Sequence, residues 1–282
     1  MSNSISITPF SAAVGAVISG VDLREPLRDD ELATMREALG EHGVLFFRDQ
    51  ELSPDNHIAF AERWGEINVN RFFSHVDGYP KIAEVLKEPG QTRNIGGGWH
   101  TDHTYDQEPA MGSMLYAREV PVKGGDTMFA NMYKAYDALS DGMKEMLGAM
   151  RAVHSSRHTF GRAAKRYQTG DNELEGRIGN PDDATQDAVH PVVITHPISG
   201  RKSLYVNGAF TTHFEGWTQE ESAPLLAFLY QHGAKPEFTG RFRWEKGSLA
   251  FWDNRATWHY ALNDYNERRY MHRITVEGEG LH

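Results

Sequence analysis

Hydrophobic residues in this chain gather mostly into short runs that are rich in Val, Ile, Phe, Tyr and Trp. Gly, Asn, Asp or Pro bounds most of these runs, a pattern typical of β-strands that end in turns. The pattern predicts strands over residues 12–23, 43–48, 81–85, 111–120, 126–131, 192–196, 203–206, 237–244, 248–252 and 270–276.

Helical patterns interrupt the predicted strands at three places. Residues 53–64 begin with Ser53 and Pro54, a pair that suits an N-cap and the first helical position. Residues 133–150 place apolar side chains at helical spacing, with a break expected at Ser140, and a third helix begins near Thr218. Many short strands with few helices favour a mainly β fold with flanking helices, a sandwich or jelly roll, over alternating βαβ units.

The chain shows no internal repeat and no Pro/Ser-rich linker, so we predict one domain over residues 1–282. Within it, residues 157–180 are polar and carry several arginines. An irregular segment of this length inside a compact domain is often an active-site lid, and we predict a lid insertion here. A solvated surface excursion is the alternative.

The absence of cysteine among the 282 residues narrows the chemistry. It excludes disulfide frameworks, thiolate zinc sites, iron–sulfur clusters and cysteine nucleophiles, so a metal site must use imidazole nitrogen and carboxylate oxygen. A formal net charge of −10 argues against non-specific nucleic-acid binding. No run approaches the ~18 apolar residues that a membrane span needs, and no secretory signal opens the chain, so we expect a cytoplasmic protein.

The most informative short segment is Trp99-His-Thr-Asp102. His100 and Asp102 are two residues apart, so on an extended strand both side chains leave the same face and can bind one ion. A second imidazole, His259, follows the predicted strand 248–252. Two imidazoles and one carboxylate form the facial triad of non-haem Fe(II) oxygenases, which leaves positions open for a cosubstrate and O2.

A chelating cosubstrate that is also a dicarboxylate needs a cation at its far end. Arg269 lies ten residues after His259, and Arg273 follows it. If the strand 270–276 starts one residue earlier, both arginines project from one face, and their guanidinium groups suit carboxylates. Thr127, which follows Gly-Gly-Asp, is a candidate hydroxyl donor to the same carboxylate.

These motifs resemble those of the taurine dioxygenase family of Fe(II)/2-oxoglutarate-dependent dioxygenases, which includes alkylsulfatases and aryloxyalkanoate dioxygenases. The resemblance covers nearly the whole chain. It is carried by residues 6–9, 15–23, 99–102, 124–127, 190–197, 204–207, 252–255 and 271–273. The family fold is a double-stranded β-helix, which agrees with the jelly roll expected from the strand pattern.

The resemblance implies that three residues bind iron, namely His100, Asp102 and His259. It also implies that Thr127 and Arg269 hold the far carboxylate of 2-oxoglutarate. The spacing from His259 to the arginine is one residue shorter than in taurine-cleaving members. We assign Arg269 because the Met271-His-Arg273 motif fixes the register, and Arg268 is the alternative.

Six residues match positions of the family's substrate pocket, or lie beside it: Arg273, Phe210, His103, Asn70, Phe73 and Gly96. Arg273 matches the residue that meets an anionic head group, and Phe210 matches an aromatic wall position. Taurine-cleaving members have His, Tyr and Asn where this chain has Asn70, Phe73 and Gly96. These departures favour a larger or more apolar anion than taurine.

The expected function is hydroxylation of an anionic small molecule (an alkyl sulfate, sulfonate or aryloxyalkanoate) at the carbon beside the heteroatom. Such a reaction yields succinate, CO2 and often the leaving group. We expect no nucleic-acid or membrane partner, and a homo-oligomer, dimer or tetramer.

Three alternatives stay open. A hydroxylase of an amino acid or secondary metabolite would give a stable alcohol. A zinc hydrolase would use the same three ligands but would not need Thr127 or Arg269. A non-catalytic jelly-roll protein would need neither the three metal ligands nor Thr127 and Arg269.

Overall fold

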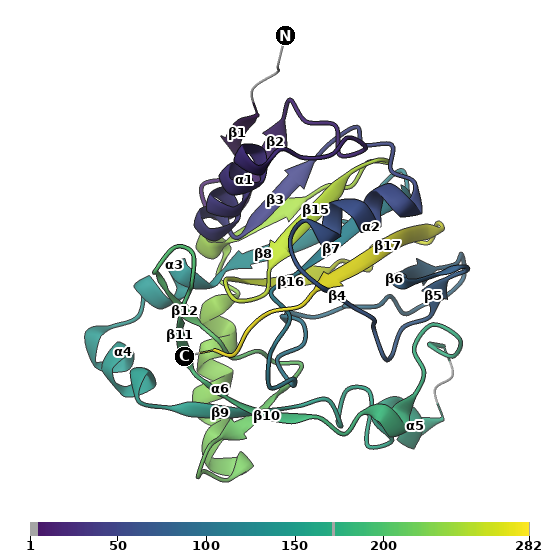
Figure 1. Ribbon diagram of the computed structural model, residues 1–282. Coiled ribbons are helices and arrows are strands. Elements are labelled where there is room, and N and C mark those ends of the chain that lie inside the picture. The colour runs from purple at the N-terminus through teal and green to yellow at the C-terminus, as the bar shows by residue number, and fades with distance from the viewer. Residues whose placement is uncertain (1–4, 171–172, 282) are drawn as a thin grey trace.

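The computed structural model describes residues 5–170 and 173–281 (Figure 1). A large, mostly antiparallel sheet forms the upper layer, with β2 and β3 its one parallel pair among these residues. Its strands, in spatial order, are β1 (Ser6–Pro9), β2 (Ala16–Ser19), β3 (Val44–Phe47), β15 (Leu249–Asp253), β7 (Gly112–Glu119), β17 (Arg269–Val276), β6 (Tyr79–Lys87) and β5 (His75–Val76), with β4 (Ile67–Asn68) paired to β17.

Three smaller sheets complete the fold among the described residues. One contains β14 (Thr239–Phe242), β8 (Thr127–Asn131) and β16 (Thr257–Ala261). The others contain β10 (Asp187–Pro191), β9 (Arg151–Ser155) and β13 (Thr211–Phe214), and β11 (Val193–Thr195) with β12 (Lys202–Leu204). The strands β9 to β12 lie below the large sheet in Figure 1. The mainly β, jelly-roll fold with flanking helices is therefore confirmed.

Helices cover both layers. On the large sheet lie α1 (Asp29–His42) and α2 (Pro54–Glu62), and around the smaller sheets lie α3 (Met132–Asp137), α4 (Asp141–Gly148) and α6 (Gln219–Gly233). The short elements are α5 (Lys165–Thr169), η1 (Pro181–Asp183) and η2 (Pro236–Phe238). No helix among the described residues is long and apolar enough to cross a membrane.

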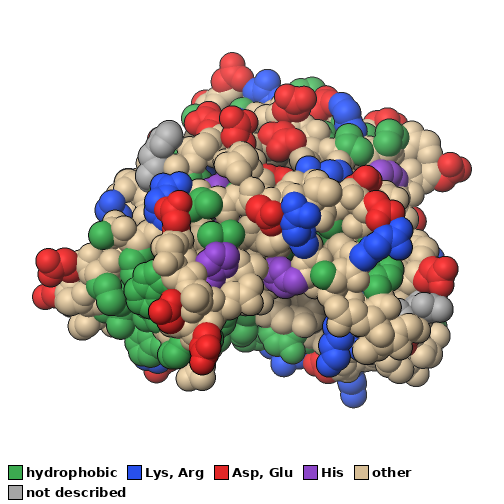
Figure 2. Space-filling view, turned by 90° about the horizontal axis from the view of Figure 1, so that it is seen from below, with side chains coloured by type: hydrophobic (Ala, Val, Ile, Leu, Met, Phe, Trp, Pro, Cys, Tyr) green, Lys and Arg blue, Asp and Glu red, His purple; other side chains and the backbone are tan. Residues whose placement is uncertain are grey.

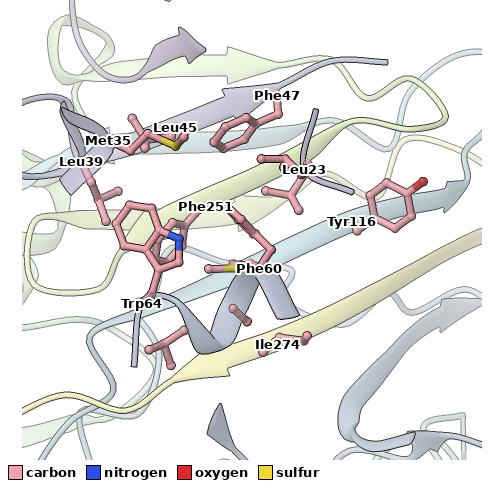
Figure 3. Packing of buried hydrophobic residues seen from close by; sticks show 14 of the residues in the cluster. Leu23, Met35, Leu39, Leu45, Phe47, Phe60, Trp64, Tyr116, Phe251 and Ile274 are labelled. Carbon is pink, nitrogen blue, oxygen red and sulfur yellow. The ribbon is translucent and has the colours of Figure 1, made fainter. Parts of the chain in front are cut away.

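The strands of the large sheet are apolar on both faces because each face is covered. Phe47 and Phe251 point toward α1 and α2, where they pack with Phe60 of α2 (Figure 3). Their neighbours Phe46 and Trp252 point to the other side and pack against β8 and β14. This alternation follows from the two-residue period of a strand and places an aromatic core between the layers.

The helix starts agree with the sequence. Ser53 caps α2 by accepting a hydrogen bond from the Asn56 N–H at 3.1 Å. The expected break at Ser140 is confirmed, since α3 ends at Asp137 and Ser140 caps α4. Thr218 caps α6, as predicted.

Two predicted strand extents were wrong, and one helix was missed. The strand expected over 12–23 is shortened to Ala16–Ser19 because Ser11 closes a turn, its Oγ accepting from the Val14 N–H at 3.0 Å. The strand expected over 237–244 begins only at Thr239, after a 3₁₀ turn. The sequence pattern also missed α1, which buries only a narrow stripe and ends where Gly43 adopts a left-handed φ of 74°. The single-domain organisation stays a prediction.

Candidate active site

His100 and His259 meet through their backbones. His259 lies in β16, and His100 lies on an extended segment that pairs with it as an isolated bridge. The His100 N–H donates to the His259 carbonyl at 3.1 Å, and the His259 N–H donates back at 2.7 Å. The strand assumed for His100 and Asp102 is therefore wrong, because the segment pairs with β16 only through this isolated bridge. The three side chains nevertheless converge.

The potential ligand atoms of His100, Asp102 and His259 all lie within 4.8 Å of one another. Nε2 of His100 lies 3.8 Å from one Asp102 oxygen, and Nε2 of His259 lies 3.7 Å from the other. Nδ1 of His100 lies 2.8 Å from the Gly98 carbonyl oxygen, which can only accept, so Nδ1 carries the proton and Nε2 offers a lone pair. Burial lowers the pKa of both imidazoles, which keeps them neutral.

Asp102 is held from the side by two donors. The Ser113 hydroxyl donates to its Oδ2 at 2.9 Å, and Nη2 of Arg273 lies 2.8 Å from the same oxygen. Burial raises the pKa of Asp102, but the positive charge of Arg273 opposes this, and the net result is a pKa well below the ordinary value. The carboxylate is therefore ionised and ready to act as a ligand.

This donor set fits a divalent first-row metal ion. Two neutral imidazole nitrogens and one carboxylate oxygen match the facial triad that Fe(II) oxygenases use. Among the described residues, no other group of three or more His, Cys, Asp or Glu side chains is close enough to hold an ion. The Gly98 contact and the Ser113 contact orient two of the three ligands before any metal binds.

Arg269 and Thr127, the residues predicted to hold the far carboxylate, line the same cavity as the triad. Arg269 begins β17, is buried, and donates from Nε to the Gly125 carbonyl at 3.1 Å, while its Nη2 has no partner among the described residues. Nε1 of Trp244 donates to Oγ1 of Thr127 at 2.9 Å, so the Thr127 hydroxyl keeps its own hydrogen to donate. Burial lowers the pKa of Arg269, a cost that an external carboxylate would offset.

All eleven residues predicted for the site line one cavity of about 640 Å³. They are His100, Asp102, His259, Thr127, Arg269, Arg273, Phe210, His103, Asn70, Phe73 and Gly96. Arg268, the alternative to Arg269, does not line it and pairs instead with Glu88 and Glu119. The strand that carries the arginines does start at Arg269, one residue before the predicted 270.

The residues predicted to contact the substrate differ in the contacts that they make within the protein. Oδ1 of Asn70 accepts from the N–H groups of Phe72 and Phe73 at 2.9 and 3.0 Å, so it shapes a turn. The guanidinium of Arg273 lies 5.4 Å from the Phe73 ring. Nδ1 of His103 lies 3.0 Å from the Asp106 carboxylate, which fixes the ring against the wall.

Gly96 keeps space open beside the metal ligands. Its φ is +80°, a conformation that side chains rarely adopt, and a Cβ there would lie 3.3 Å from Cε1 of His100. Any side chain at this position would therefore crowd His100 and occupy part of the cavity, which the glycine leaves open.

Segment 157–180 supplies cavity residues that the sequence did not single out. Phe160 and Ile178 are buried and line the cavity, together with Arg166. Phe160 stacks on Phe72 at 4.3 Å, and Ile178 pairs with Phe73 as an isolated bridge. Apolar residues in an otherwise polar segment were the only sequence signal for this role.

The cationic character of the cavity is local. On the face shown in Figure 2, acidic and basic side chains are interspersed, with no broad field of one sign. The cavity, in contrast, gathers Arg269 and Arg273 within a chain whose net charge is −10. The local charge of the cavity wall thus differs from the net charge of the chain.

Asp253 supports the strand that carries His259. It is fully buried, accepts from Nε and Nη2 of Arg255 at 2.9 and 2.6 Å, and lies 3.0 Å from Nε2 of His196. Burial raises the pKa of Asp253, but the contacts with Arg255 and His196 lower it by more. The net pKa is well below its ordinary value. Its carbonyl accepts from the Thr257 hydroxyl, which fixes the turn into β16.

Replacing Asp253 by Asn should therefore lower the free energy of unfolding by about 3 kcal/mol, because Arg255 loses its buried counterion. A carboxylate whose folded pKa is depressed stabilises the fold above its unfolded pKa of about 4, and that contribution disappears as the pH falls. The difference between wild type and Asp253→Asn should accordingly shrink below about pH 4. Urea denaturation across pH measures it, and a difference that grows with acidity would contradict this reading.

Comparison with known proteins places the site in context. A family model described as taurine catabolism dioxygenase TauD, TfdA family matches residues 6–275. An α-ketoglutarate-dependent sulfate ester dioxygenase from Pseudomonas putida is 34% identical over 277 residues, covering 98% of this chain and 90% of that protein. An α-ketoglutarate-dependent 2,4-dichlorophenoxyacetate dioxygenase from Cupriavidus pinatubonensis is 34% identical, covering 97% and 98%.

A solved structure agrees with these sequence relatives. The crystal structure of a taurine dioxygenase from Burkholderia xenovorans superimposes with a TM-score of 0.81 and 36% identity, covering 98% of this chain and 90% of that one. The names of the three proteins include a sulfate ester, an aryloxyacetate and taurine. Similarity of this extent shows the family, whereas the substrate has to be argued from the cavity.

Proposed function

This chain belongs to the TauD/TfdA family and is an α-ketoglutarate-dependent (2-oxoglutarate-dependent) dioxygenase, and we propose that it hydroxylates an alkyl sulfate, sulfonate or aryloxyalkanoate beside the heteroatom. One observation carries the proposal. A single large cavity brings a His-Asp-His cluster together with two buried arginines and an aromatic wall.

We assign His100, Asp102 and His259 as the residues that hold Fe(II). When bound, Fe(II) couples oxidative decarboxylation of 2-oxoglutarate by O2 to hydroxylation of a substrate C–H bond, with succinate and CO2 as the other products. The chain's own contribution is to present two neutral imidazoles and an ionised carboxylate at fixed positions.

We assign Arg269 and Thr127 to the far carboxylate of 2-oxoglutarate. Both side chains line the cavity, both retain hydrogen-bond donors, and neither faces a carboxylate within salt-bridge distance among the described residues. Two donors converging on one carboxylate fix the cosubstrate's orientation relative to the triad, which a single charge would not do.

The primary substrate belongs on the Arg273 side of the cavity. Arg273 supplies a cation, and Phe73, Phe210 and Tyr105 supply apolar surface, with the Tyr105 and Phe210 rings 4.9 Å apart. A cavity of about 640 Å³ is large for taurine and suits a longer or aromatic anion. Hydroxylation at the carbon bearing the heteroatom gives a product that collapses to a carbonyl compound and releases the leaving group.

We further propose that residues 157–180, of which 171 and 172 lie outside the described residues, act as a cover that excludes water from the reacting centre. Thr159 ties this segment to the Ala209 carbonyl at 2.7 Å, and Phe160 and Ile178 close the cavity wall. Exclusion of water strengthens the contacts between the arginines and the bound anions. The homo-oligomer and the cytoplasmic location stay predictions.

The test is succinate formation from 2-oxoglutarate with added Fe(II), across hexyl sulfate, hexane-1-sulfonate, 2,4-dichlorophenoxyacetate and taurine. We expect at least one of the first three to show a higher kcat/KM than taurine. Taurine as the best substrate would refute the proposed substrate class. Release of sulfate, sulfite or phenol separates this reaction from a hydroxylase that gives a stable alcohol, and release without O2 and 2-oxoglutarate would indicate a hydrolase.

A further inference from the structure

The cavity contains one more buried cation, which the reaction proposed above does not use. Arg166 of α5 lines the cavity and is only 9% exposed. Its Nη2 lies 3.4 Å from the Phe160 carbonyl oxygen and 3.1 Å from the Tyr167 hydroxyl. Its Nε and Nη1 have no hydrogen-bond partner among the described residues, so donors of this guanidinium remain available.

Arg166 differs in this respect from Arg157 and Arg162 of the same segment, whereas Arg177 is buried but donates to backbone carbonyls such as that of Leu86 at 2.9 Å. Arg157 pairs with Asp187 at 2.9 Å, and Arg162 pairs with Asp182 at 2.5 Å, both at the surface. Arg166 has no carboxylate within 4.0 Å among the described residues. A guanidinium removed from water without a counterion is costly, so its place in a cavity wall suits an anion that arrives from outside.

The two anionic groups assigned above bind to other cationic side chains of the cavity. Arg269 with Thr127 accounts for 2-oxoglutarate, and Arg273, which contacts Asp102, accounts for the head group of the substrate. Both of those arginines come from β17, whereas Arg166 comes from segment 157–180. The cavity therefore presents cations from two separate parts of the chain.

We propose that Arg166 binds a second anionic group on the primary substrate, so that the preferred substrate is a dianion. One anionic group would meet Arg273 beside the reacting carbon, and a carboxylate or similar group elsewhere on the molecule would meet Arg166. This inference rests on the proposed function, because it specifies the substrate of that same site. Phe160 and Phe210, which line the same cavity, would contact the apolar part of such a molecule.

The experiment compares ω-sulfoalkanoates with alkane-1-sulfonates of equal carbon number, over a series of chain lengths. Binding to the full chain without added iron is measured by calorimetry, and kcat/KM is measured from succinate formation with Fe(II). We expect the wild type to bind the best dianion about tenfold more tightly than its matched monoanion. Arg166→Gln should remove this preference while changing monoanion binding by less than about twofold.

Two variants separate recognition from packing. Arg166→Lys keeps the charge and should retain most of the dianion preference, which also guards against a folding defect in Arg166→Gln. Arg162→Gln alters an exposed arginine of the same segment that already has a partner, and should change neither affinity. Equal weakening of both anions by Arg166→Gln, no change in either, or a wild-type preference for the monoanion would overturn the inference.

The two proposals fail in different ways. If no compound of the series yields succinate, the proposed substrate class is wrong, whereas the calorimetric comparison still decides whether Arg166 binds a second anion. If succinate forms from the monoanions alone, the proposed function stands and the assignment of Arg166 falls.

Discussion

His259→Ala lowers substrate-dependent succinate formation by at least about a thousandfold, because one of three ligands is lost from a site that depends on metal-assisted chemistry. The remaining His100 and Asp102 leave a site with too few ligands to fix the ion. Fe(II) affinity, measured by equilibrium dialysis of the variant, should fall in parallel with activity. His100→Ala and Asp102→Ala should give the same result.

The control for this experiment is His42→Ala. His42 lies in the last turn of α1, outside the cavity, so its removal should leave both Fe(II) affinity and succinate formation close to wild type. Full activity in any of the three ligand variants would break the assignment of the metal site. Loss of activity with unchanged Fe(II) affinity would assign the residue another role.

Arg269→Gln raises the KM for 2-oxoglutarate by about a hundredfold, because a buried, charge-assisted contact to the far carboxylate is replaced by a neutral amide. The KM for the primary substrate should change little, since that molecule is assigned to Arg273. Succinate formation measured over a range of 2-oxoglutarate concentrations, at saturating primary substrate, gives this value.

Arg268→Gln provides a closely matched comparison. Arg268 is the neighbouring arginine, but it pairs with Glu88 and Glu119 at the surface and does not line the cavity. Its replacement should leave the KM for 2-oxoglutarate within about twofold of wild type, as expected for a surface ion pair. A larger effect of Arg268→Gln than of Arg269→Gln would show that the register of β17 was assigned incorrectly.

The strands could be predicted from sequence where both faces of the sheet are buried. The predicted strands 43–48 and 248–252 contain the continuous apolar runs 44–47 and 249–252, because helices cover one face and the smaller sheets cover the other. Helix α1 was missed because its polar surface faces solvent and only a few residues, such as Met35 and Leu39, are buried. Its end is defined by Gly43, whose backbone conformation is not visible in a hydrophobic pattern.

The site was predictable where residue type and spacing determine the chemistry. His100, Asp102 and His259 could be proposed from their ligand types, and the structure brings them together. Contacts between distant segments were not predictable. The Trp244 contact that frees the Thr127 hydroxyl for donation is one case. The burial of Arg166 is another, because composition does not distinguish it from exposed arginines of the same segment such as Arg157 and Arg162.

The reciprocal backbone pairing of His100 with His259 also constrains how the chain acquires its site. More than half of the chain separates the two residues, so their meeting closes a very long loop, which makes the contact strongly non-local. His259 also pairs with Phe129 of β8. A complete set of three ligands therefore requires the smaller sheet as well as the bridge to His100, so capture of the metal reports that this sheet has been assembled.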